Sequence, residues 1–475
     1  MFDSSCVSDR RQFMRQMFYG IAAASLPVRL AGAKDVKDRP NVIFVMADDL
    51  GFGDPGCYGQ KLIKTPNIDN LAEEGIRFTS CYSGSTICAP SRSVLMTGQH
   101  TGHTRVRGNM CPVGGVVGYK GTTQVRRVCL TDEDTTVGNV MHSAGYRTGI
   151  VGKWHLDAYD PKAGPVNRGF DEFKGWLISA DGTGGYFPEK HVVNNEVIDL
   201  PENADGRHGK YTTDLFTDEA IEFIKNNKSS PFFLYLAYNN PHTPFQTPDL
   251  GPYKDKDWPK HCKIYAAMVD RLDMNIARLI RSLKDAGLDK KTLVFFCSDN
   301  GPRSEPSKIK TEVAEFFDSN GPLRGYKRDL YEGGIRVPMI ARWPGTIKPG
   351  TTSDVPWYFA DVMATVAAAG SATVPENTDG VSVLDILTGK KTELKDRFLY
   401  WEYFESGFQQ AVRWGKWKAL LLKRGKPMEL YDLSTDIGEQ NNVAADHPEV
   451  VGKITEYLKT ARTESANWPL SAIKD

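Results

Sequence analysis

Asn41-Val42-Ile43-Phe44-Val45-Met46-Ala47 is an apolar run of strand length, and the acidic pair Asp48-Asp49 follows it directly. An unbroken apolar run, rather than an alternating one, is typical of a parallel strand that is buried on both faces. The stretch therefore predicts a central strand of a parallel sheet, with two carboxylates at its carboxyl end.

Helix patterns and apolar strands alternate through most of the chain. A long amphipathic helix is expected at 264–283, because apolar residues recur there at helical spacing. Further strands are expected at 148–151, 232–237 and 292–297, and further helices at 66–74, 136–144 and 214–226. This alternation is typical of a sheet between two layers of helices. We therefore predict the α/β fold class, with a mostly parallel sheet sandwiched by helices.

The pattern changes at about residue 393. Short strand patterns joined by glycine-containing turns, which are typical of antiparallel sheet, occupy 398–403, 410–413, 417–421 and 429–433, with a closing helix at 447–462. We therefore predict a main domain at 40–392 and a smaller α+β domain, containing an antiparallel sheet and a helix, at 393–475. The polar stretch 303–315 is expected to form a surface loop or an insertion.

Residues 1–33 have the features of an export signal. Arg10-Arg11-Gln12-Phe13-Met14 begins a twin-arginine pattern, an Ala-rich apolar stretch follows at 17–26, and Ala31-Gly32-Ala33 is a small-residue cleavage site. The alternative, a membrane anchor, needs about 20 apolar residues, which is more than this stretch offers. We therefore expect a twin-arginine-like signal peptide, a periplasmic or secreted protein, and no membrane span in the mature form.

The 475-residue chain carries 59 basic and 59 acidic residues, so its formal net charge is zero. Proteins that bind nucleic acid or an anionic membrane surface through their overall charge are strongly basic. The composition therefore excludes these partners for the chain as a whole, and local clusters of cations must carry any anion binding.

Polar side chains follow several of the expected strands. They are Asp48-Asp49, Lys153 and His155, His242, and Asp299-Asn300. The carboxyl ends of parallel strands meet at one edge of a sheet, and ligands of α/β proteins bind there. Either acidic pair alone would be an ordinary turn cap. Together Asp48, Asp49, Asp299 and Asn300 offer only oxygen ligands, which suit a hard cation such as Ca²⁺ or Mg²⁺.

Cys88-Ala89-Pro90-Ser91-Arg92 is the second stretch with a chemical role. If a helix continues from Ser91, its free backbone N–H groups and its dipole suit an anionic substrate. A thiol is a good nucleophile only where positive neighbours stabilise its thiolate. For this pattern alone, an ordinary cysteine before a helix remains the alternative.

Four cations are expected near the metal site, namely Lys153, His155, Lys327 and Arg92. Surface charge is the alternative for any single lysine, but Lys153 and His155 follow an apolar strand directly and share one side of an extended chain. His242 lies in the rigid turn Pro241-His242-Thr243-Pro244, which suits a general acid.

These motifs resemble those of the type I sulfatases of the alkaline-phosphatase-like superfamily, from Asn41 to the C-terminal helix. The resemblance is carried by Asp48-Asp49, Cys88-Ala89-Pro90-Ser91-Arg92 with Leu95-Met96-Thr97-Gly98, Gly152-Lys153-Trp154-His155, Pro241-His242 and Asp299-Asn300-Gly301. Met96 departs from the pattern, because leucine is common there. The resemblance implies an alkaline-phosphatase-like fold and the activity of a sulfuric ester hydrolase.

The resemblance also implies that Cys88 is converted to Cα-formylglycine by a formylglycine-generating enzyme, and that one Ca²⁺ ion is bound. One hydroxyl of the hydrated aldehyde attacks the sulfur, and the other lets the ester collapse with release of sulfate. Asp299 is implied to be both a metal ligand and the base for the attacking hydroxyl. Arg92 is implied to hold the formylglycine oxygen.

Further roles follow from the same resemblance. Lys153, His155 and Lys327 are implied to bind the sulfate oxygens, and His242 to protonate the leaving alcohol. His155 is the alternative residue for assisting the collapse.

The segment 101–109 resembles bacterial sulfatases that act on sulfated galactose or N-acetylgalactosamine units of polysaccharides. Arg107 and Asn109 are expected to hydrogen-bond sugar hydroxyls, and Trp154 or Trp176 is expected to stack on a sugar face. Each residue type is more often structural than substrate-binding.

Three other functions are considered. One is a phosphate-ester or phosphonate hydrolase of the same superfamily, against which the full set of cations is an argument. The second is a non-catalytic binder of sulfated glycans in which Cys88 stays unmodified. The third is a thiol or zinc protein, which finds no support because the cysteines show no zinc spacing.

Overall fold

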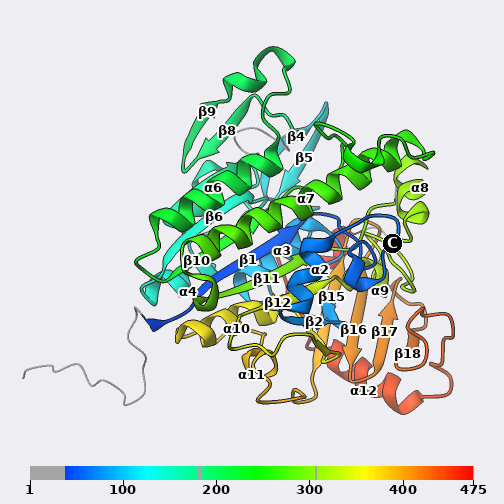
Figure 1. Cartoon of the computed structure of the whole chain (residues 1–475). Helices are drawn as coiled ribbons and strands as arrows, with labels where there is room; N and C mark the ends of the chain where they lie inside the picture. The colour runs from blue at the N-terminus through cyan, green and yellow to red at the C-terminus, as the bar shows by residue number, and fades with distance from the viewer. Residues whose placement is uncertain (1–37, 179–184, 305–307, 474–475) are drawn as a thin grey trace, which may run out of the picture. The chain divides into compact units, whose positions relative to one another are not determined.

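The computed structural model describes residues 38–178, 185–304 and 308–473. The predicted signal peptide at 1–33 lies outside the described residues. Within them, the large sheet has ten strands in the order β13-β2-β12-β11-β1-β10-β6-β7-β8-β9 (Figure 1). The bounds of its central parallel strands are β11 (Thr292–Ser298), β1 (Asn41–Ala47), β10 (Phe232–Ala237), β6 (Arg147–Lys153) and β7 (Glu172–Trp176).

Antiparallel pairings occur toward both edges of this sheet. β11 pairs antiparallel with the next strand, and so does β7. The outer strands are β12 (Met339–Arg342), β2 (Ile76–Phe78), β13 (Thr351–Ser353), β8 (Lys190–Val193) and β9 (Glu196–Asp199). β1 lies between β10 and β11 and is parallel to both, so the strand expected at the centre of the sheet is there.

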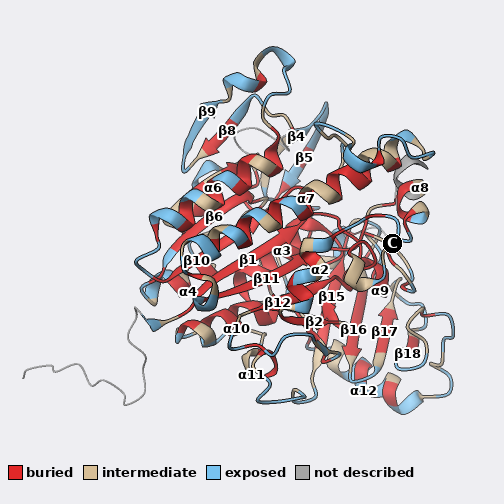
Figure 2. Ribbon diagram, viewed as in Figure 1, coloured by how far each residue is buried: buried red, intermediate tan, exposed pale blue. Residues whose placement is uncertain are grey.

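Helices cover both faces of the large sheet. One face carries α2 (Pro66–Glu73), α6 (Thr212–Asn226) and α7 (Lys260–Asp285), and the other carries α3 (Cys88–Thr97), α4 (Val137–Ser143) and α10 (Ala360–Gly370). Side chains of β1 alternate between two cores: Ile43 and Val45 pack with the first group, and Phe44 with the second. The central strands are buried, whereas the outer strand β9 and the outer faces of the helices are exposed (Figure 2). The predicted α/β sandwich is confirmed.

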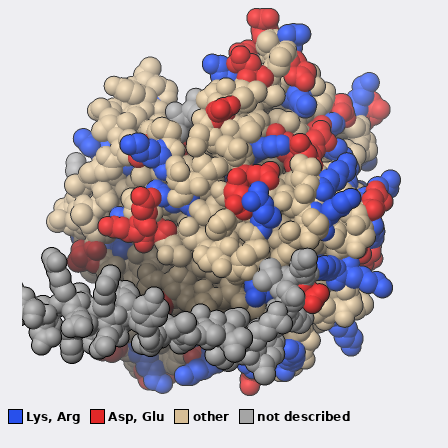
Figure 3. All heavy atoms as spheres, turned by 90° about the vertical axis from the view of Figure 1, so that its left-hand side faces the viewer, with Lys and Arg blue, Asp and Glu red and all other residues tan. Residues whose placement is uncertain are grey.

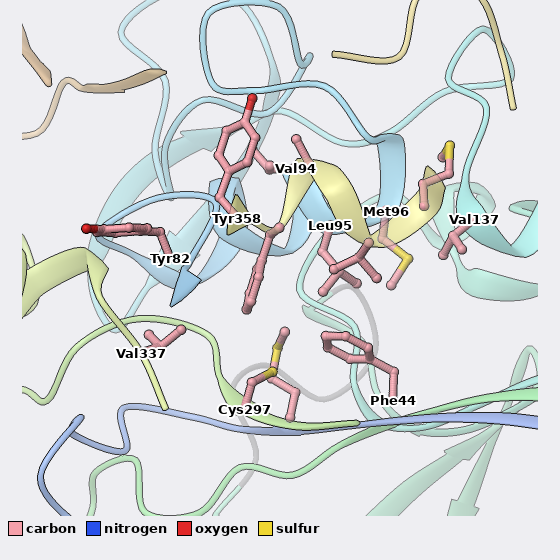
Figure 4. Packing of buried hydrophobic residues seen from close by; sticks show 14 of the residues in the cluster. Phe44, Tyr82, Val94, Leu95, Met96, Val137, Cys297, Val337 and Tyr358 are labelled. Atoms are coloured by element: carbon pink, nitrogen blue, oxygen red, sulfur yellow. The ribbon is translucent and has the colours of Figure 1, made fainter. Parts of the chain in front are cut away.

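α3 is held against the sheet by apolar packing. Leu95 and Met96 of α3 face Phe44 of β1 and Cys297 of β11 in the same core (Figure 4). Burial of each such side chain contributes about 1.5–3 kcal/mol. This packing holds the start of α3, where Cys88 lies, above the sheet.

A second, antiparallel sheet follows in the chain, as predicted. It consists of β15 (Phe398–Tyr403), β16 (Gln409–Trp414), β17 (Trp417–Leu421) and β18 (Glu429–Asp432), and α12 (Pro448–Leu458) covers one face of it. Val412 packs toward α12, whereas Ala411 belongs to the core of the main sheet. Because the two parts share a core, residues 36–475 form one compact unit, and the domain boundary at 392/393 stays a prediction.

The remaining elements are short. They are β3 (Cys81–Tyr82), β14 (Trp357–Tyr358), the hairpin of β4 (Val116–Lys120) and β5 (Thr123–Arg127), α8 (Lys308–Phe316), α9 (Glu332–Ile335) and α11 (Leu384–Leu387). The prediction of a loop at 303–315 was wrong over the part that forms α8. Val313 and the neighbouring Phe317 are buried in the core with α7. Tertiary packing therefore stabilises a helix that the polar composition of the segment did not indicate.

The surface agrees with the neutral composition. On the face shown in Figure 3, basic and acidic side chains are interspersed. Among the described residues, no helix has both the length and the apolar character needed to cross a membrane.

Candidate active site

The carboxyl ends of four neighbouring parallel strands bring the predicted residues to one edge of the sheet. Asp48-Asp49 follows β1, His242 follows β10, Asp299-Asn300 follows β11, and Lys153 is the last residue of β6. Cys88 begins α3, three residues earlier than the expected helix start at Ser91. The structure thus brings together residues that are far apart in the sequence.

The acidic residues are linked by direct hydrogen bonds. Asp299 Oδ1 accepts from the backbone N–H of Asp49 at 3.2 Å, and Asn300 Nδ2 donates to Asp49 Oδ1 at 2.8 Å. Asp299 Oδ2 accepts from Arg92 Nη2 at 2.8 Å, and Lys153 Nζ forms an ion pair with Asp48. The cluster is almost completely buried.

Two buried oxygen atoms of this cluster are available to a metal ion. Asp49 Oδ2 and Asn300 Oδ1 receive no hydrogen bond from any residue that the structure describes. Burial of such atoms without a partner is costly. Asp48, Asp49, Cys88 and His242 each place a possible ligand atom within 4.8 Å of the others. Within this group the carboxylates of Asp48 and Asp49, together with the partnerless oxygen of Asn300, are the donors that fit a hard divalent cation.

Opposing charges shift the pKa values of the carboxylates in different directions. Burial acts to raise the pKa of Asp48, but Lys153 and the other nearby cations outweigh it and hold that pKa well below the ordinary value. For Asp299, burial and the charge of Asp48 raise the pKa to about 6. Burial acts to lower the pKa of Lys327, but Asp49 outweighs it and the pKa is raised. Lys327 is therefore a fixed cation in the site.

Cys88 lies between opposite charges. Lys327 Nζ donates to Cys88 Sγ at 3.1 Å, and the thiol donates to Asp48 Oδ1 at 3.5 Å. Burial, with the charge of Asp299, raises the pKa of the Cys88 thiol to about 12 despite the nearby lysines. The thiol is therefore protonated near neutral pH and is a poor nucleophile.

Both predicted histidines have a lowered pKa and are therefore neutral near pH 7. Burial, with Lys153 and Arg127 nearby, holds the pKa of His155 well below its ordinary value, and its Nε2 lies 3.2 Å from Arg127 Nη1. Burial lowers the pKa of His242 to about 4. The Nδ1–H of His242 donates to the Thr243 carbonyl at 2.5 Å, which leaves Nε2 directed to Asp49 Oδ2 at 3.6 Å.

A cavity of about 570 Å³ opens onto these groups. Its lining includes the predicted Asp48, Cys88, Asn109, Lys153, His155, His242 and Lys327. It also includes Trp176, the alternative stacking residue, and residues for which the sequence offered no motif, namely Lys120, Arg127, Tyr186, Asn239, Arg303, Arg328 and Glu405. Charge within the segment 116–127 was the available signal for Lys120 and Arg127, but the hairpin that carries them is brought to the cavity only by folding.

Two of the predicted sugar-binding residues do not line the cavity. Arg107 is buried and donates to Glu402 Oε1 at 3.1 Å and to the Thr463 carbonyl at 3.0 Å, so it joins 101–109 to the C-terminal part of the chain. The Trp154 ring is buried and its Nε1 donates to the Ala163 carbonyl at 2.9 Å. Both side chains thus have protein partners and lie away from the cavity. Asn109 does line the cavity.

Comparison with known proteins places this site in context. The sulfatase family model matches residues 40–371, and a family model described as N-sulphoglucosamine sulphohydrolase, C-terminal, matches residues 325–464. Human arylsulfatase A is 32% identical over an alignment of 504 positions, gaps included. The alignment covers 94% of this chain and 92% of the relative.

One bacterial relative and one solved structure are similar to this chain over most of their length. The N-acetylgalactosamine-6-O-sulfatase of Bacteroides thetaiotaomicron is 29% identical over 499 residues, covering 90% of this chain and 93% of the relative. The crystal structure of Ps i-CgsB in complex with k-i-k-neocarrahexaose superposes with a TM-score of 0.77 at 30% identity, covering 92% of this chain and 95% of the other.

Proposed function

Because the chain belongs to the sulfatase family and is a sulfuric ester hydrolase, we propose that it removes sulfate from sulfated carbohydrates with a formylglycine made from Cys88. One observation carries this proposal. Cys88 lies in a cavity between Lys327 and a cluster of buried carboxylates, yet its raised pKa makes the thiol itself a poor nucleophile. A residue in this position is better explained as a precursor than as the reacting group.

Modification of Cys88 supplies the missing nucleophile. Formylglycine forms a hydrated aldehyde. In the first step, one hydroxyl attacks sulfur and the bond from sulfur to the alcohol oxygen breaks. In the second step, the other hydroxyl loses its proton, the aldehyde re-forms and the sulfate group leaves. The residues around Cys88 suit this chemistry. Asp299 is proposed as the base for the attacking hydroxyl, and its buried carboxylate, which the Arg92 guanidinium orients, supports that role.

We propose that Asp48, Asp49, Asp299 and Asn300 hold one Ca²⁺ ion. The buried oxygens of Asp49 and Asn300 that lack a hydrogen-bond partner support this, as does the all-oxygen donor set. When bound, the ion acts as a Lewis acid toward a sulfate oxygen.

The cations are proposed to bind the sulfate group. Lys153 and Lys327 border the cavity and form ion pairs with Asp48 and Asp49, so each can donate to a sulfate oxygen. Arg92 is buried with its guanidinium on Asp299 and is proposed to orient the oxygen of the modified Cys88. His155, with Arg127 beside its ring, is proposed to complete the set.

His242 is proposed to protonate the leaving alcohol. The hydrogen bond from its Nδ1 fixes the ring and leaves Nε2 toward the reacting groups. An anionic substrate raises the pKa of a nearby imidazole and thus favours the protonated form that donates. Alternatively, His155 assists the collapse of the sulfated intermediate instead of binding a sulfate oxygen.

The proposed substrates are sulfated galactose or N-acetylgalactosamine units of polysaccharides. The name of the Bacteroides thetaiotaomicron relative and the sugar ligand of the Ps i-CgsB structure support this class. The cavity combines aromatic side chains, Trp176 and Tyr186, with polar ones such as Asn109, a combination that suits a sugar ring with one charged group.

We further propose that residues 1–33 direct the protein to the periplasm or the medium, and that a formylglycine-generating enzyme modifies Cys88 during maturation. In the proposed domain organisation, 40–392 is the catalytic domain and 393–475 is the smaller domain. An exported protein is located where sulfated polysaccharides are found, which is consistent with the proposed substrate.

A parallel assay tests the proposed function. Protein made in a host with the maturation enzyme is offered defined sulfated mono- and oligosaccharides and the matched phosphate esters, and mass spectrometry is applied to the peptide that contains Cys88. We expect sulfate release from at least one galactose or N-acetylgalactosamine sulfate and a formylglycine at position 88. Faster turnover of the phosphate esters, or an unmodified thiol in an inactive protein, would overturn the proposal.

A further inference from the structure

A second cavity, of about 660 Å³, lies where the small sheet meets the main part of the chain. Its lining comes from residues 79–80, 354–356 and 392–397, from Arg336 and Leu399, from Arg413 of β16 with the turn that follows it, and from residues 433–437 after β18. None of its lining residues lines the active-site cavity. Nothing in the proposed catalytic mechanism makes use of it.

Arg413 is the buried cation of this cavity. It lies on β16, directly opposite Leu399 of β15 and Lys418 of β17, and its exposed fraction is only 7%. Directly opposite residues of an antiparallel pair share one face, and like charges in that position destabilise the pair. Arg413 and Lys418 are therefore two buried cations side by side, on the face of the small sheet that lies opposite to α12.

The nearby carboxylates are already engaged by other cations. Lys418 Nζ donates to Glu332 Oε1 at 2.9 Å and to Glu439 Oε1 at 3.3 Å. Arg336 Nε donates to Glu332 Oε2 at 2.6 Å. Lys418 and Arg336 thus take both buried carboxylates, and Arg413 has no direct carboxylate partner among the residues that the structure describes. A negative charge is missing from this group.

The guanidinium of Arg413 also lacks hydrogen-bond acceptors. Its Nε and Nη1 are buried and find no acceptor among the residues that the structure describes. The two other arginines of the lining differ, because Arg336 donates to Glu332, the Thr79 carbonyl and Tyr82, and Arg397 donates to Asp361. A buried charge with unused donors is costly, so this arrangement favours a bound acceptor.

We propose that this cavity is a second anion-binding site, in which Arg413 binds a sulfate group that is either free or carried by a sugar. A guanidinium presents its donors as a planar fork that matches two oxygens of such a group. The exposed rim carries both signs, Asp354, Glu393 and Asp396 with Lys395 and Lys416, so selectivity for the anion comes from the buried Arg413. The volume lies within the range of small-molecule sites and admits a sugar unit beside the sulfate group.

Selenate, an analogue of sulfate that can be located by anomalous scattering, is the first probe. Crystals of the unmutated protein are soaked in selenate, and we expect one peak in the active site and a second within hydrogen-bonding distance of Arg413. The absence of the second peak at a concentration that fills the active site would overturn the proposal, and this measurement requires no variant.

Two variants test the role of Arg413. Arg413→Gln is expected to lose the second peak and to weaken sulfate binding at that site at least tenfold, while the constant for product inhibition by sulfate at the active site stays unchanged. Arg413→Lys keeps the charge without the planar fork and is expected to show intermediate binding. Arg147→Gln, at a side chain 48% exposed and outside both cavities, is the matched control. A second peak that survives in Arg413→Gln would contradict the assignment.

Titration of the Cys88→Ala variant, which leaves the ester intact, with selenate, with galactose 6-sulfate and with galactose distinguishes the two sources of the sulfate group. Occupancy of the second site by the sugar sulfate well above that by selenate identifies a site for sulfated sugar units, and equal occupancy identifies a site for free sulfate. Equal binding of unsulfated galactose would overturn the proposal, because recognition would then not depend on the anion.

Discussion

Cys88 is the residue on which turnover is expected to depend most. We predict that Cys88→Ala folds normally but hydrolyses sulfate esters about 10³-fold more slowly or worse, since no side chain remains to attack sulfur. Steady-state kinetics and a thermal melt measure the two effects. Cys262→Ala is the control, because Cys262 is also buried but does not line the cavity. Near-normal rates for Cys88→Ala would exclude the formylglycine mechanism.

Asp299 connects the proposed metal site to Arg92, since its two oxygens accept from the Asp49 backbone and from the Arg92 guanidinium. We predict that Asp299→Asn weakens Ca²⁺ binding by more than about tenfold and abolishes turnover, because an amide has less charge for the ion. Metal analysis after dialysis and a Ca²⁺ titration measure the loss. Asp54→Asn, at another buried aspartate, should retain the ion; an unchanged metal content in Asp299→Asn would remove this residue from the ligand set.

The role of His242 can be separated from binding by the choice of leaving group. We predict that His242→Asn lowers the turnover of a sugar sulfate by about 10²-fold or more, but lowers that of 4-nitrophenyl sulfate far less, because nitrophenolate leaves without protonation. The comparison needs only kcat for the two substrates. His142→Asn, at a side chain 56% exposed, is the control. Equal losses on both substrates would assign the proton transfer to another residue.

At the scale of secondary structure, buried ion pairs join α9 to β17. Glu332 at the start of α9 accepts from Lys418 on β17 and from Arg336. Burial acts to raise the pKa of Glu332, but Lys418 and Arg336 outweigh it and lower that pKa to about 2. A carboxyl group whose pKa is lower in the folded state stabilises the fold above its unfolded pKa, and this stabilisation is lost as the pH falls through the interval below it.

The sign of this effect gives a prediction for Glu332→Gln. The unmutated protein should be more stable than the variant at pH values above the ordinary Glu pKa of 4.5, and the difference should shrink as the pH falls toward 2. Urea unfolding at several pH values between about 6 and about 3 measures the difference. Glu202→Gln, at a side chain 50% exposed, should show little change over the same range. A difference that does not vary with pH would mean that Glu332 does not titrate in this way.

At the scale of the whole molecule, the predicted export can be tested apart from the enzyme site. We predict that replacing Arg10-Arg11 with Lys-Lys leaves the protein in the cytoplasm of a bacterial host, because the twin-arginine route requires both arginines. Immunoblots of cytoplasm and periplasm, with the unmutated chain beside it, measure the distribution. Unchanged export would mean that another route carries the protein.

The two sheets also act together at this scale. Arg107 donates to Glu402 on β15, and Tyr331 next to α9 donates to Glu429 on β18, so the small sheet is bound to segments that border the active site. The segment 101–109, expected to contact a sugar, is therefore partly a structural link. Substitution of Arg107 acts on the fold before it acts on substrate.

The sequence by itself determined the alternation of strands and helices and the identity of the residues at the strand ends. The apolar run of β1 and the helical spacing of α7 are local patterns. The order of apolar and polar residues along a short segment indicates whether one side or both sides of the element are buried. Parallel strands then bring their carboxyl ends to one edge, which is why Asp48, His242 and Asp299 were predicted to meet.

Only the tertiary structure decided which side chains face each other across the chain. Arg127 beside His155 and Arg107 against Glu402 are contacts between segments whose local sequence shows no signal. The helix α8 belongs with these cases, because its stability comes from packing against α7 and not from its own polar residues. The physical reason is common to all of them: the free energy of a buried charge or a packed helix depends on its partners in space, and those partners are distant in the sequence.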